Sequence, residues 1–271
     1  MVQSILVTGA NKGLGFESVK QLSKAFPNAT IFLGARSVSR GQEAVNKLHA
    51  ENLGQHVQVL ELDVSNPESI ARAFENVRSI INTLDVLVNN AGITENESTS
   101  AGVFAVNLFG VKQMVDTFTP ILASNGLIIN VSSEVGTWSQ HNMSPELQST
   151  LSDIDNLSWN KLVEFAQDYQ QPTKKYGWPS PEKTFGTYGI SKTLLTAYTR
   201  LLAAEKRDLH VVAVCPGYCA TDLNQNSGFR SVVVGGSSII WPILNPGFTE
   251  GLLYQDGEAM PFSGPMPAHF H

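Results

Sequence analysis

The residues best suited to chemistry in this sequence are a tyrosine and a lysine four positions apart, Tyr188 and Lys192. Residues i and i+4 of a helix share one face, so a helix that begins near Tyr188 and runs to about Lys206 makes the two side chains neighbours. A free phenol has a pKa near 10, and a nearby ammonium lowers it. The pair could therefore exchange a proton in a reaction. Such pairs are also common by chance, so this one needs support from elsewhere in the chain.

Two further polar positions stand close to predicted apolar elements. Ser132 and Ser133 follow an apolar run, 126–131, that predicts a strand. A hydroxyl at that strand end could steady a substrate carbonyl. Asn107 lies inside the apolar run 104–110, where its amide must be satisfied either structurally or by holding a water in a functional path.

A glycine-rich turn follows the first predicted strand, 4–8. Its G-x-x-x-G-x-G spacing lets the backbone approach a pyrophosphate, while the N-terminus of the next helix faces the phosphate charge. Glycines also serve ordinary tight turns, but the position directly after the first strand favours dinucleotide binding. The residues of this turn that we expect to bind the cofactor are Gly9, Asn11, Lys12, Gly13, Leu14 and Gly15.

The end of the second predicted strand indicates which dinucleotide is bound. An NAD site usually offers an acidic residue there for the ribose 2′-hydroxyl, and the segment 34–40 has none. Arg36 and Arg40 can instead face a 2′-phosphate, toward which Lys12 also points. The alternative is that these are ordinary solvated charges. We expect NADPH.

Polar residues also follow the third and fourth predicted strands. Asn90, Ala91 and Gly92 come after the fourth strand, and Asp63 comes after the third. A polar side chain at such a strand end can bind a nucleotide. Asp63 can equally cap a helix or close a turn, and spacing alone does not decide between these roles.

Short apolar runs alternate with helix-length amphipathic segments through most of the chain. The predicted strands are 4–8, 29–34, 57–62, 84–88, 126–131 and 209–214, with helices such as 13–26 and 39–52 between them. This alternation predicts βαβ units. We therefore expect an α/β fold, a single-domain Rossmann-like doubly wound parallel sheet flanked by helices, with ligands beyond the carboxyl ends of the strands. The segment of about 137–185 breaks the rhythm and is interpreted as an insertion that contains a helix over 158–170 and no strand.

Composition excludes several classes of protein. The chain has 271 residues, 42% hydrophobic and 15% charged, with a net charge of −6. This acidic balance argues against a nucleic-acid partner. No apolar run reaches the roughly 18 residues of a membrane span, and the N-terminus does not resemble a signal peptide. Cys215 and Cys219 are the only cysteines, so reduced thiols in a cytoplasmic protein are expected.

Taken in chain order, these motifs resemble the short-chain dehydrogenase/reductase family over about residues 5–222. The resemblance rests on Thr8-Gly9-x-x-x-Gly13-x-Gly15, Asn89-Asn90-Ala91-Gly92, Asn107, Ser133, Tyr188-x-x-x-Lys192 and Pro216-Gly217. It implies that Tyr188 donates the proton in a reduction, that Lys192 holds the nicotinamide ribose and lowers the Tyr188 pKa, and that Ser133 orients the carbonyl. Asn107 would hold a proton-relay water.

The same resemblance extends the cofactor site beyond the glycine turn. Asp63 and Asn90 would border the adenosine, and Thr221 would meet the carboxamide end of the nicotinamide. The other residues that it assigns to the cofactor are Val64, Ala91, Gly92, Pro216 and Gly217. No metal site is expected.

Within the family the chain is most similar to the NADPH-dependent carbonyl reductase branch. The motifs that carry this likeness are Asn11-Lys12-Gly13, Ala35-Arg36 with Arg40-Gly41-Gln42, Ser144-Pro145-Glu146-Leu147-Gln148, Gly177-Trp178-Pro179 and Cys215-Pro216-Gly217. Ser133 and Tyr188 are 55 positions apart, which matches that branch's insertion over the surface used elsewhere for tetramer packing. A monomer is therefore implied.

Two segments depart from the branch. Only 15 positions separate Gly92 from Asn107, fewer than usual. Little matches in the substrate-loop and C-terminal region of about 218–271, in which residues 254–257 could form a last strand and a pocket lid.

We therefore expect an NADPH-dependent reductase of a small-molecule ketone or aldehyde. The alternatives are an NADP-dependent secondary-alcohol dehydrogenase, since the same site runs both ways, and an NADP-binding sensor or scaffold without catalysis. Candidates for the substrate pocket, each of which could equally pack the interior, are Glu134, Trp138, Trp178, Tyr218 and Phe229.

Overall fold

The computed structural model describes residues 2–267, and its centre is an eight-stranded sheet with strand order β3-β2-β1-β4-β5-β6-β7-β8. Every neighbouring pair from β3 to β7 is parallel, and β8 runs antiparallel to β7. The strands are β1 (Ser4–Val7), β2 (Thr30–Ala35), β3 (Val57–Glu61), β4 (Leu84–Asn89), β5 (Leu122–Val131), β6 (His210–Val214), β7 (Leu253–Gln255) and β8 (Glu258–Met260).

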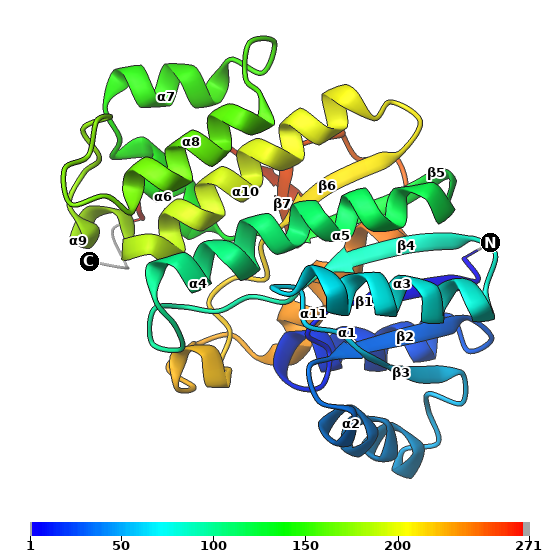
Figure 1. Ribbon diagram of the computed structural model, residues 1–271. Helices are drawn as coiled ribbons and strands as arrows, with labels where there is room; N and C mark the ends of the chain where they lie inside the picture. Colours follow the sequence, from blue (N-terminus) through cyan, green and yellow to red (C-terminus); the bar gives the residue numbers. More distant parts are fainter. Residues whose placement is uncertain (1, 268–271) are drawn as a thin grey trace.

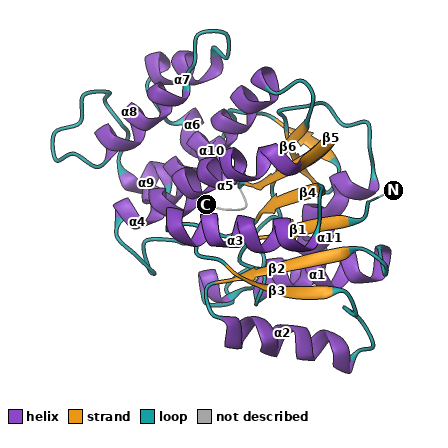
Figure 2. Cartoon of the chain, turned by 45° about the vertical axis from the view of Figure 1, so that its right-hand side comes forward, coloured by secondary structure: helices purple, strands orange, loops and turns teal. Residues whose placement is uncertain are grey.

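Helices cover both faces of this sheet (Figures 1 and 2). The helices are α1 (Gly13–Ala25), α2 (Val38–Ala50), α3 (Pro67–Ile80), α4 (Ser100–Phe104), α5 (Val111–Phe118), α6 (Glu134–His141), α7 (Pro145–Ser152), α8 (Trp159–Tyr169), α9 (Pro181–Thr184), α10 (Gly186–Glu205) and α11 (Val232–Leu244). A π-helical turn, η1 (Ala105–Gly110), joins α4 to α5, and η2 (Thr119–Ile121) and η3 (Asp222–Asn224) are 3-10 turns.

Successive residues of the central strands point into two different cores, as the two-residue period of a strand requires. Ile5 and Val7 pack with apolar residues of α1, α2 and α11 on one face. Leu6 packs on the other face with residues of α3, α5 and α10. Because both faces are buried, the central strands consist mostly of apolar residues.

The predicted α/β fold is confirmed, and the six predicted strands appear with shifts of a few residues at their ends. The sheet departs from parallel pairing at one edge. The chain after β7 turns back through Asp256 and Gly257, which have positive φ angles of 53 and 88°, and the resulting tight hairpin makes β8 antiparallel. Residues 268–271 of the predicted C-terminal region lie outside the described part of the chain.

The segment 137–185, predicted to be an insertion, folds as the end of α6 followed by α7, α8 and α9. Ser158 caps α8 and Gln170 ends it, as the sequence predicted. In Figure 1 these helices form a green layer outside α10. Trp159 packs edge-on against Tyr198 of α10, with 5.2 Å between the ring centres, so the segment is anchored to the helix that carries Tyr188 and Lys192.

Among the helices that were not predicted is α11. The segment 231–241 contains Gly235-Gly236 and Ser237-Ser238, which weaken a helical pattern, yet α11 forms there with Pro242 inside it. Gly235 and Gly236 let α11 pack closely on α1: an added Cβ would lie 2.5 Å from a methyl of Leu14 at Gly235 and 2.8 Å from Glu17 Cγ at Gly236. Among residues 2–267, no helix has the length and apolar content that crossing a bilayer requires.

Candidate active site

The turn between β1 and α1 is shaped by its glycines. Gly9 and Gly13 have φ angles of 63 and 58°, which glycine adopts without strain. A Cβ at Gly15 would lie 2.4 Å from Asn90 Nδ2 and 2.6 Å from the Gly9 carbonyl. No side chain caps the start of α1, where Lys12 is the cap residue, and the first turn contains no acid. The N–H groups of that turn are thus left for an external anion.

Asn90 ties the end of β4 to this turn. Its Nδ2 donates to the carbonyls of Thr8 at 2.8 Å and Gly9 at 3.2 Å. Thr8 Oγ1 accepts the backbone N–H groups of Asn90 at 3.0 Å and Ala91 at 2.9 Å. The side chain that was predicted to border the adenosine therefore also holds the glycine turn in place.

A cleft of about 510 Å³ runs along the carboxyl ends of the strands. The predicted cofactor residues that line it are Gly9, Asn11, Lys12, Gly13, Leu14, Gly15, Arg36, Asp63, Val64, Asn90, Ala91, Gly92, Lys192, Pro216 and Thr221. Arg40 is exposed in the first turn of α2. Gly217, with a φ of 74°, has its α-carbon against Arg230, where an added Cβ would lie 2.5 Å from Arg230 Cδ.

The charged residues at one end of the cleft are exposed to solvent. Arg36 follows β2 and lines the cleft. Lys12 Nζ forms an ion pair with Asp222 Oδ2 at 2.8 Å, so it reaches across the cleft mouth toward η3. Asp63 Oδ1 accepts from the N–H of Ser65 at 2.9 Å and from its hydroxyl at 2.6 Å. Asp63 thus closes a turn and also lines the cleft. Its contact with the nucleotide stays a prediction.

Tyr188 and Lys192 line the other end of the cleft, and the side chain of Ser133 lies beside Tyr188. Lys192 Nζ lies 5.7 Å from the centre of the Tyr188 ring and donates to the Val131 carbonyl at 2.7 Å. The Tyr188 hydroxyl is hydrogen-bonded to the side chain of Ser133. Ser132 lines the cleft but is 2% exposed, and its hydroxyl is bonded to Thr196 Oγ1 at 2.7 Å. The serine that interacts with Tyr188 is therefore Ser133, the second of the pair.

Close packing of α6 on α10 brings these groups together. A Cβ at Gly136 would lie 2.7 Å from the Lys192 carbonyl carbon, so only glycine permits this approach. Thr193 Oγ1 donates to the Gly136 carbonyl at 2.7 Å. Because Ser133 is the N-cap residue of α6, this contact sets its position relative to α10.

A buried polar chain that was not predicted anchors α10 to the sheet from below. Asn89 Nδ2 donates to Asn130 Oδ1 at 2.9 Å, and Asn130 Nδ2 donates to Thr199 Oγ1 at 2.9 Å. The two asparagines are neighbours in the β4–β5 register. Each precedes a predicted site by one to three residues, which was the only sequence signal for the pair.

Burial dominates the protonation of both central groups. It raises the pKa of Tyr188 to about 12, against a hydrogen bond from Ser133 that lowers it. Burial also lowers the pKa of Lys192 to about 8. The desolvation of the phenol outweighs the hydrogen bond that lowers its pKa. The expected lowering of the Tyr188 pKa by Lys192 stays a prediction.

Asn107 is fully buried in the π-helical turn η1. Its Oδ1 accepts from Ile93 N at 2.9 Å, and its Nδ2 donates to the Ile93 carbonyl at 2.9 Å and to Ser191 Oγ at 3.0 Å. The amide is thus satisfied structurally and joins the loop after β4 to α10. Single π-helical turns often occur at functional sites. The water-holding role stays a prediction.

Cys215 and Cys219 are both buried free thiols, as predicted. Cys215 directly follows β6, beside the same cluster. Its Sγ accepts from the N–H groups of Glu134 and Gly217, each at 3.3 Å. Burial raises the pKa of Cys215 to about 12. It is therefore a neutral thiol at pH 7 that links the start of α6 to the loop after β6.

The candidate pocket residues fall into different surroundings. Trp178 packs in the aromatic cluster on α8, with its Nε1 donating to Asp168 Oδ2 at 2.8 Å, as expected of a residue that packs the interior. Trp138 is buried against Phe185. Glu134 directly follows Ser133 at the start of α6. The rings of Tyr218 and Phe229 pair 5.8 Å apart and are 38% and 68% exposed.

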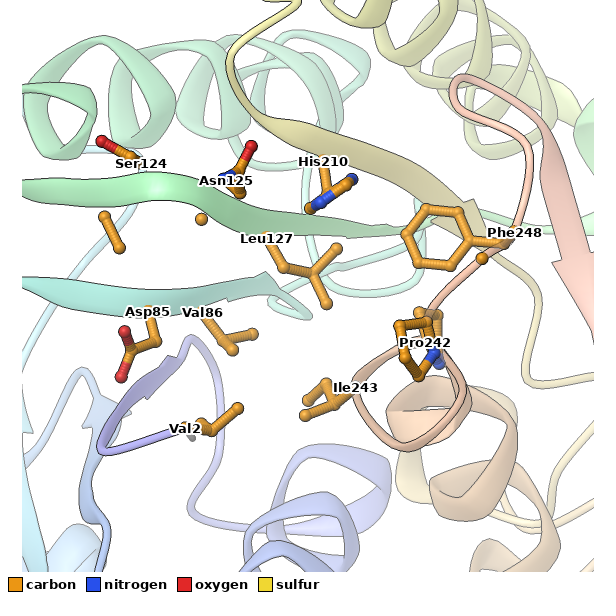
Figure 3. A pocket seen from close by; sticks show the side chains of 14 residues that line it. Val2, Asp85, Val86, Ser124, Asn125, Leu127, His210, Pro242, Ile243 and Phe248 are labelled. Carbon is orange, nitrogen blue, oxygen red and sulfur yellow. The ribbon is translucent and has the colours of Figure 1, made fainter.

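A second cavity, of about 300 Å³, lies toward the opposite, amino ends of the central strands (Figure 3). Asp85 on its wall accepts the backbone N–H groups of Gln3 at 2.6 Å and Ser4 at 3.0 Å. His210 is bonded to Glu250 at 2.6 Å. The chain itself thus engages Asp85 and His210, whereas Tyr188, Lys192 and most of the predicted cofactor residues line the first cleft.

Comparison with known proteins places this geometry in context. Residues 3–145 match the sequence profile described as short chain dehydrogenase. The chain is 34% identical to the carbonyl reductase (NADPH) 3 of Rattus norvegicus, over 93% of this chain and 95% of the relative. It is also 34% identical to a (+)-neomenthol dehydrogenase of Arabidopsis thaliana, over 89% and 91% of the two chains. The solved salutaridine reductase from Papaver somniferum superposes with a TM-score of 0.83 at 27% identity, covering 93% of this chain and 99% of that one.

Proposed function

Because the chain belongs to the short-chain dehydrogenase family, we propose that it is an NADPH-dependent carbonyl reductase that converts a ketone or aldehyde into an alcohol. The names of its relatives in rat and mouse, with NADPH as the cofactor, support this choice of reaction. The observation that carries the proposal is that Tyr188 and Lys192 lie together in the glycine-lined cleft, with Ser133 beside Tyr188.

The residues present fit a phosphorylated dinucleotide. The first turn of α1 has N–H groups without a side-chain cap, and glycines keep the backbone before it bare, which suits a pyrophosphate. Arg36 lines the cleft after β2, where the segment has no acid, and Arg40 is exposed in the next turn. Both guanidiniums suit a ribose 2′-phosphate.

When bound, the cofactor would supply a hydride to the carbonyl carbon. The chain's own residues handle the carbonyl oxygen. The side chains of Ser133 and Tyr188 lie within hydrogen-bond reach of each other, so both hydroxyls can contact the carbonyl oxygen of the same substrate. As negative charge develops there, the proton of Tyr188 passes to the oxygen, and the Lys192 ammonium stabilises the phenolate that remains.

The protonation of Tyr188 supports reduction over alcohol oxidation. With a pKa of about 12, the phenol keeps its proton at neutral pH and acts as an acid. Oxidation would need a base at that position. Lys192 with a pKa of about 8 is still mostly charged at pH 7, which is the form that stabilises the phenolate. We further propose that Asn107 helps to supply the replacement proton through a water.

We also propose that the protein acts as a monomer in the cytoplasm. The outward side of α10 is covered by the segment 137–185, through contacts such as Trp159 on Tyr198, and this supports a monomer. The free thiols Cys215 and Cys219 are usual in reducing compartments. Light scattering during gel filtration would test the first point, and a stable dimer or tetramer would contradict it.

A panel of quinones, aromatic ketones and cyclic ketones, followed by loss of NADPH absorbance, tests the function. Turnover with NADPH that clearly exceeds turnover with NADH is expected. Faster turnover with NADH would overturn the assignment of Arg36 and Arg40. Binding of NADPH with no oxidation across the whole panel would favour a sensor or scaffold.

A further inference from the structure

The helix that carries Tyr188 and Lys192 lacks a cap of its own. The residue before α10 is Phe185, with φ of 54° and ψ of 39°, and its side chain cannot accept a hydrogen bond. The first N–H groups of a helix need external partners. Tyr188 is the third residue of α10, the position whose N–H an ordinary N-cap side chain would bind.

A glutamate from a distant loop takes the place of that cap. Glu95 lies in the connection between β4 and α4, and its Oε1 accepts the backbone N–H of Tyr188 at 3.0 Å. The chain makes room for it at Gly186, where an added Cβ would lie 2.4 Å from Glu95 Oε1. Ser100 and Thr187 form a second link between the same segments, with 2.7 Å between their hydroxyl oxygens.

This loop is also held from its other side, because Asn107 bonds both the N–H and the carbonyl of Ile93. The carboxylate of Glu95 is thus supported at a fixed place next to the first turn of α10. An acidic group at a helix N-terminus is favourable both as a hydrogen-bond acceptor and toward the helix dipole.

We infer that Glu95 is a positioning residue for the reaction, which fixes the first turn of α10 and thereby the Tyr188 hydroxyl relative to Ser133. The inference rests on the proposed role of Tyr188 as proton donor. It adds a carboxylate to the site that acts through another residue rather than on the substrate.

The charge of Glu95 has a consequence that its hydrogen bond alone would not have. The groups that face Tyr188 are Lys192 on α10, Cys215 at the end of β6, Ser133 at the start of α6, and Glu95 itself; Glu97 lines the same cleft. A nearby negative charge favours the neutral phenol, and Glu95 contributes in this direction to the raised pKa of Tyr188. Removing the charge should therefore lower the pH at which Tyr188 ionises.

Two substitutions separate the hydrogen bond from the charge. Glu95→Gln keeps an acceptor oxygen and removes the charge, whereas Glu95→Ala removes both. Glu146→Gln, on the exposed start of α7, is the matched control for a lost surface carboxylate. Each variant is assayed for kcat and for KM toward NADPH, and tyrosinate formation with rising pH is followed by ultraviolet absorbance in the protein without ligand. Subtracting the same titration of a Tyr188→Phe protein isolates Tyr188.

We expect Glu95→Ala to lower kcat about tenfold, because small misplacements of a catalytic group are costly, with KM for NADPH nearly unchanged. Glu95→Gln should retain most of kcat, while Tyr188 ionises about half a pH unit lower. Unchanged kcat in Glu95→Ala, or Tyr188 titrating in Glu95→Gln as it does in the Glu146→Gln control, would overturn the inference. Absence of any turnover in the unmodified protein would instead defeat the proposed function, and the titration would still test Glu95.

Discussion

The two ends of the cleft hold their positive charges in opposite ways. At the glycine turn, the side chain of Lys12 is 61% exposed and paired with an exposed Asp222, and Arg36 is exposed beside it. At the reactive end, Lys192 is 4% exposed and its ammonium is bonded to the Val131 carbonyl. Exposed ion pairs contribute about 1 kcal/mol at most and are screened by salt, whereas a buried ammonium lowers stability unless it is well compensated.

We infer from this difference that the exposed charges serve cofactor affinity, whereas the buried ammonium of Lys192 serves the reaction. A phosphate brings its own charge and can be met at the surface. A phenol that must release a proton needs a desolvated cation beside it, where the interaction is strong. Substitutions at the exposed end should therefore change cofactor affinity and little else, while those at the buried end should change turnover and stability in opposite directions.

The largest effect is expected from Lys192→Met. The substitution removes the ammonium that stabilises the Tyr188 phenolate, so kcat should fall roughly a thousandfold. Steady-state kinetics with the best carbonyl substrate measure this. Lys47→Met on the exposed face of α2 is the control, and a similar kcat in the two variants would break the distinction between the two ends.

A smaller effect is expected at the exposed end from Arg36→Ala. Loss of a guanidinium facing the 2′-phosphate should reduce the preference for NADPH over NADH by about ten- to thirtyfold, through KM rather than kcat. The ratio of kcat/KM for the two cofactors measures it, with Arg72→Ala on the exposed face of α3 for comparison. An unaltered ratio would mean that the 2′-phosphate is bound elsewhere.

Lys192→Met should be more stable than the unmodified protein, although it should be less active. The pKa of Lys192 is lowered to about 8, so at this residue the unfolded chain binds more protons than the folded protein between pH 8 and about 10.5. The contribution of Lys192 to stability therefore rises with pH in that window. At pH 7 the full cost of burying the ammonium applies. The unfolding free energy of Lys192→Met should therefore exceed that of the unmodified protein by about 1 kcal/mol. Urea unfolding at pH 7 and pH 10 tests this. The stability advantage of Lys192→Met should shrink at pH 10, and an advantage that grows there would contradict the account.

The smallest effect is expected from Asp222→Asn, which removes the partner of Lys12. Hydrogen bonds and charge from Lys12 lower the pKa of Asp222, but both side chains are mostly exposed. The unfolding free energy should change by less than about 0.5 kcal/mol, while KM for NADPH should fall up to about twofold because Lys12 is released toward the phosphates. A loss of affinity instead would show that the pair orders the cleft mouth.

The contrast between the two ends also separates what the sequence could predict from what it could not. The glycine turn is local: spacing within Gly9–Gly15 and its place after a strand were enough to predict it. Helical spacing placed Tyr188 and Lys192 on one face of a helix, and the family resemblance gave them their expected roles. The raised pKa of Tyr188 was not predicted, because it depends on burial by segments far away in the chain.

Three particular residues illustrate the limit. Trp178 was a candidate pocket residue because of its residue type, but it packs on α8. Residues far away in the sequence decide which rings an aromatic side chain contacts. Glu95 had no signal, because its bond to Tyr188 spans 93 positions. Gly235 indicated a break, whereas in the structure it permits close packing of α11 on α1. Local patterns do not encode such long-range fits.

The most direct measurement concerns Tyr188→Phe, which removes only the hydroxyl. NADPH binding, followed by fluorescence titration, should remain within about twofold of the unmodified protein, while turnover of the best carbonyl substrate should drop by at least about a thousandfold. Full turnover in this variant, with NADPH bound normally, would remove the phenol from the reaction and contradict the central claim.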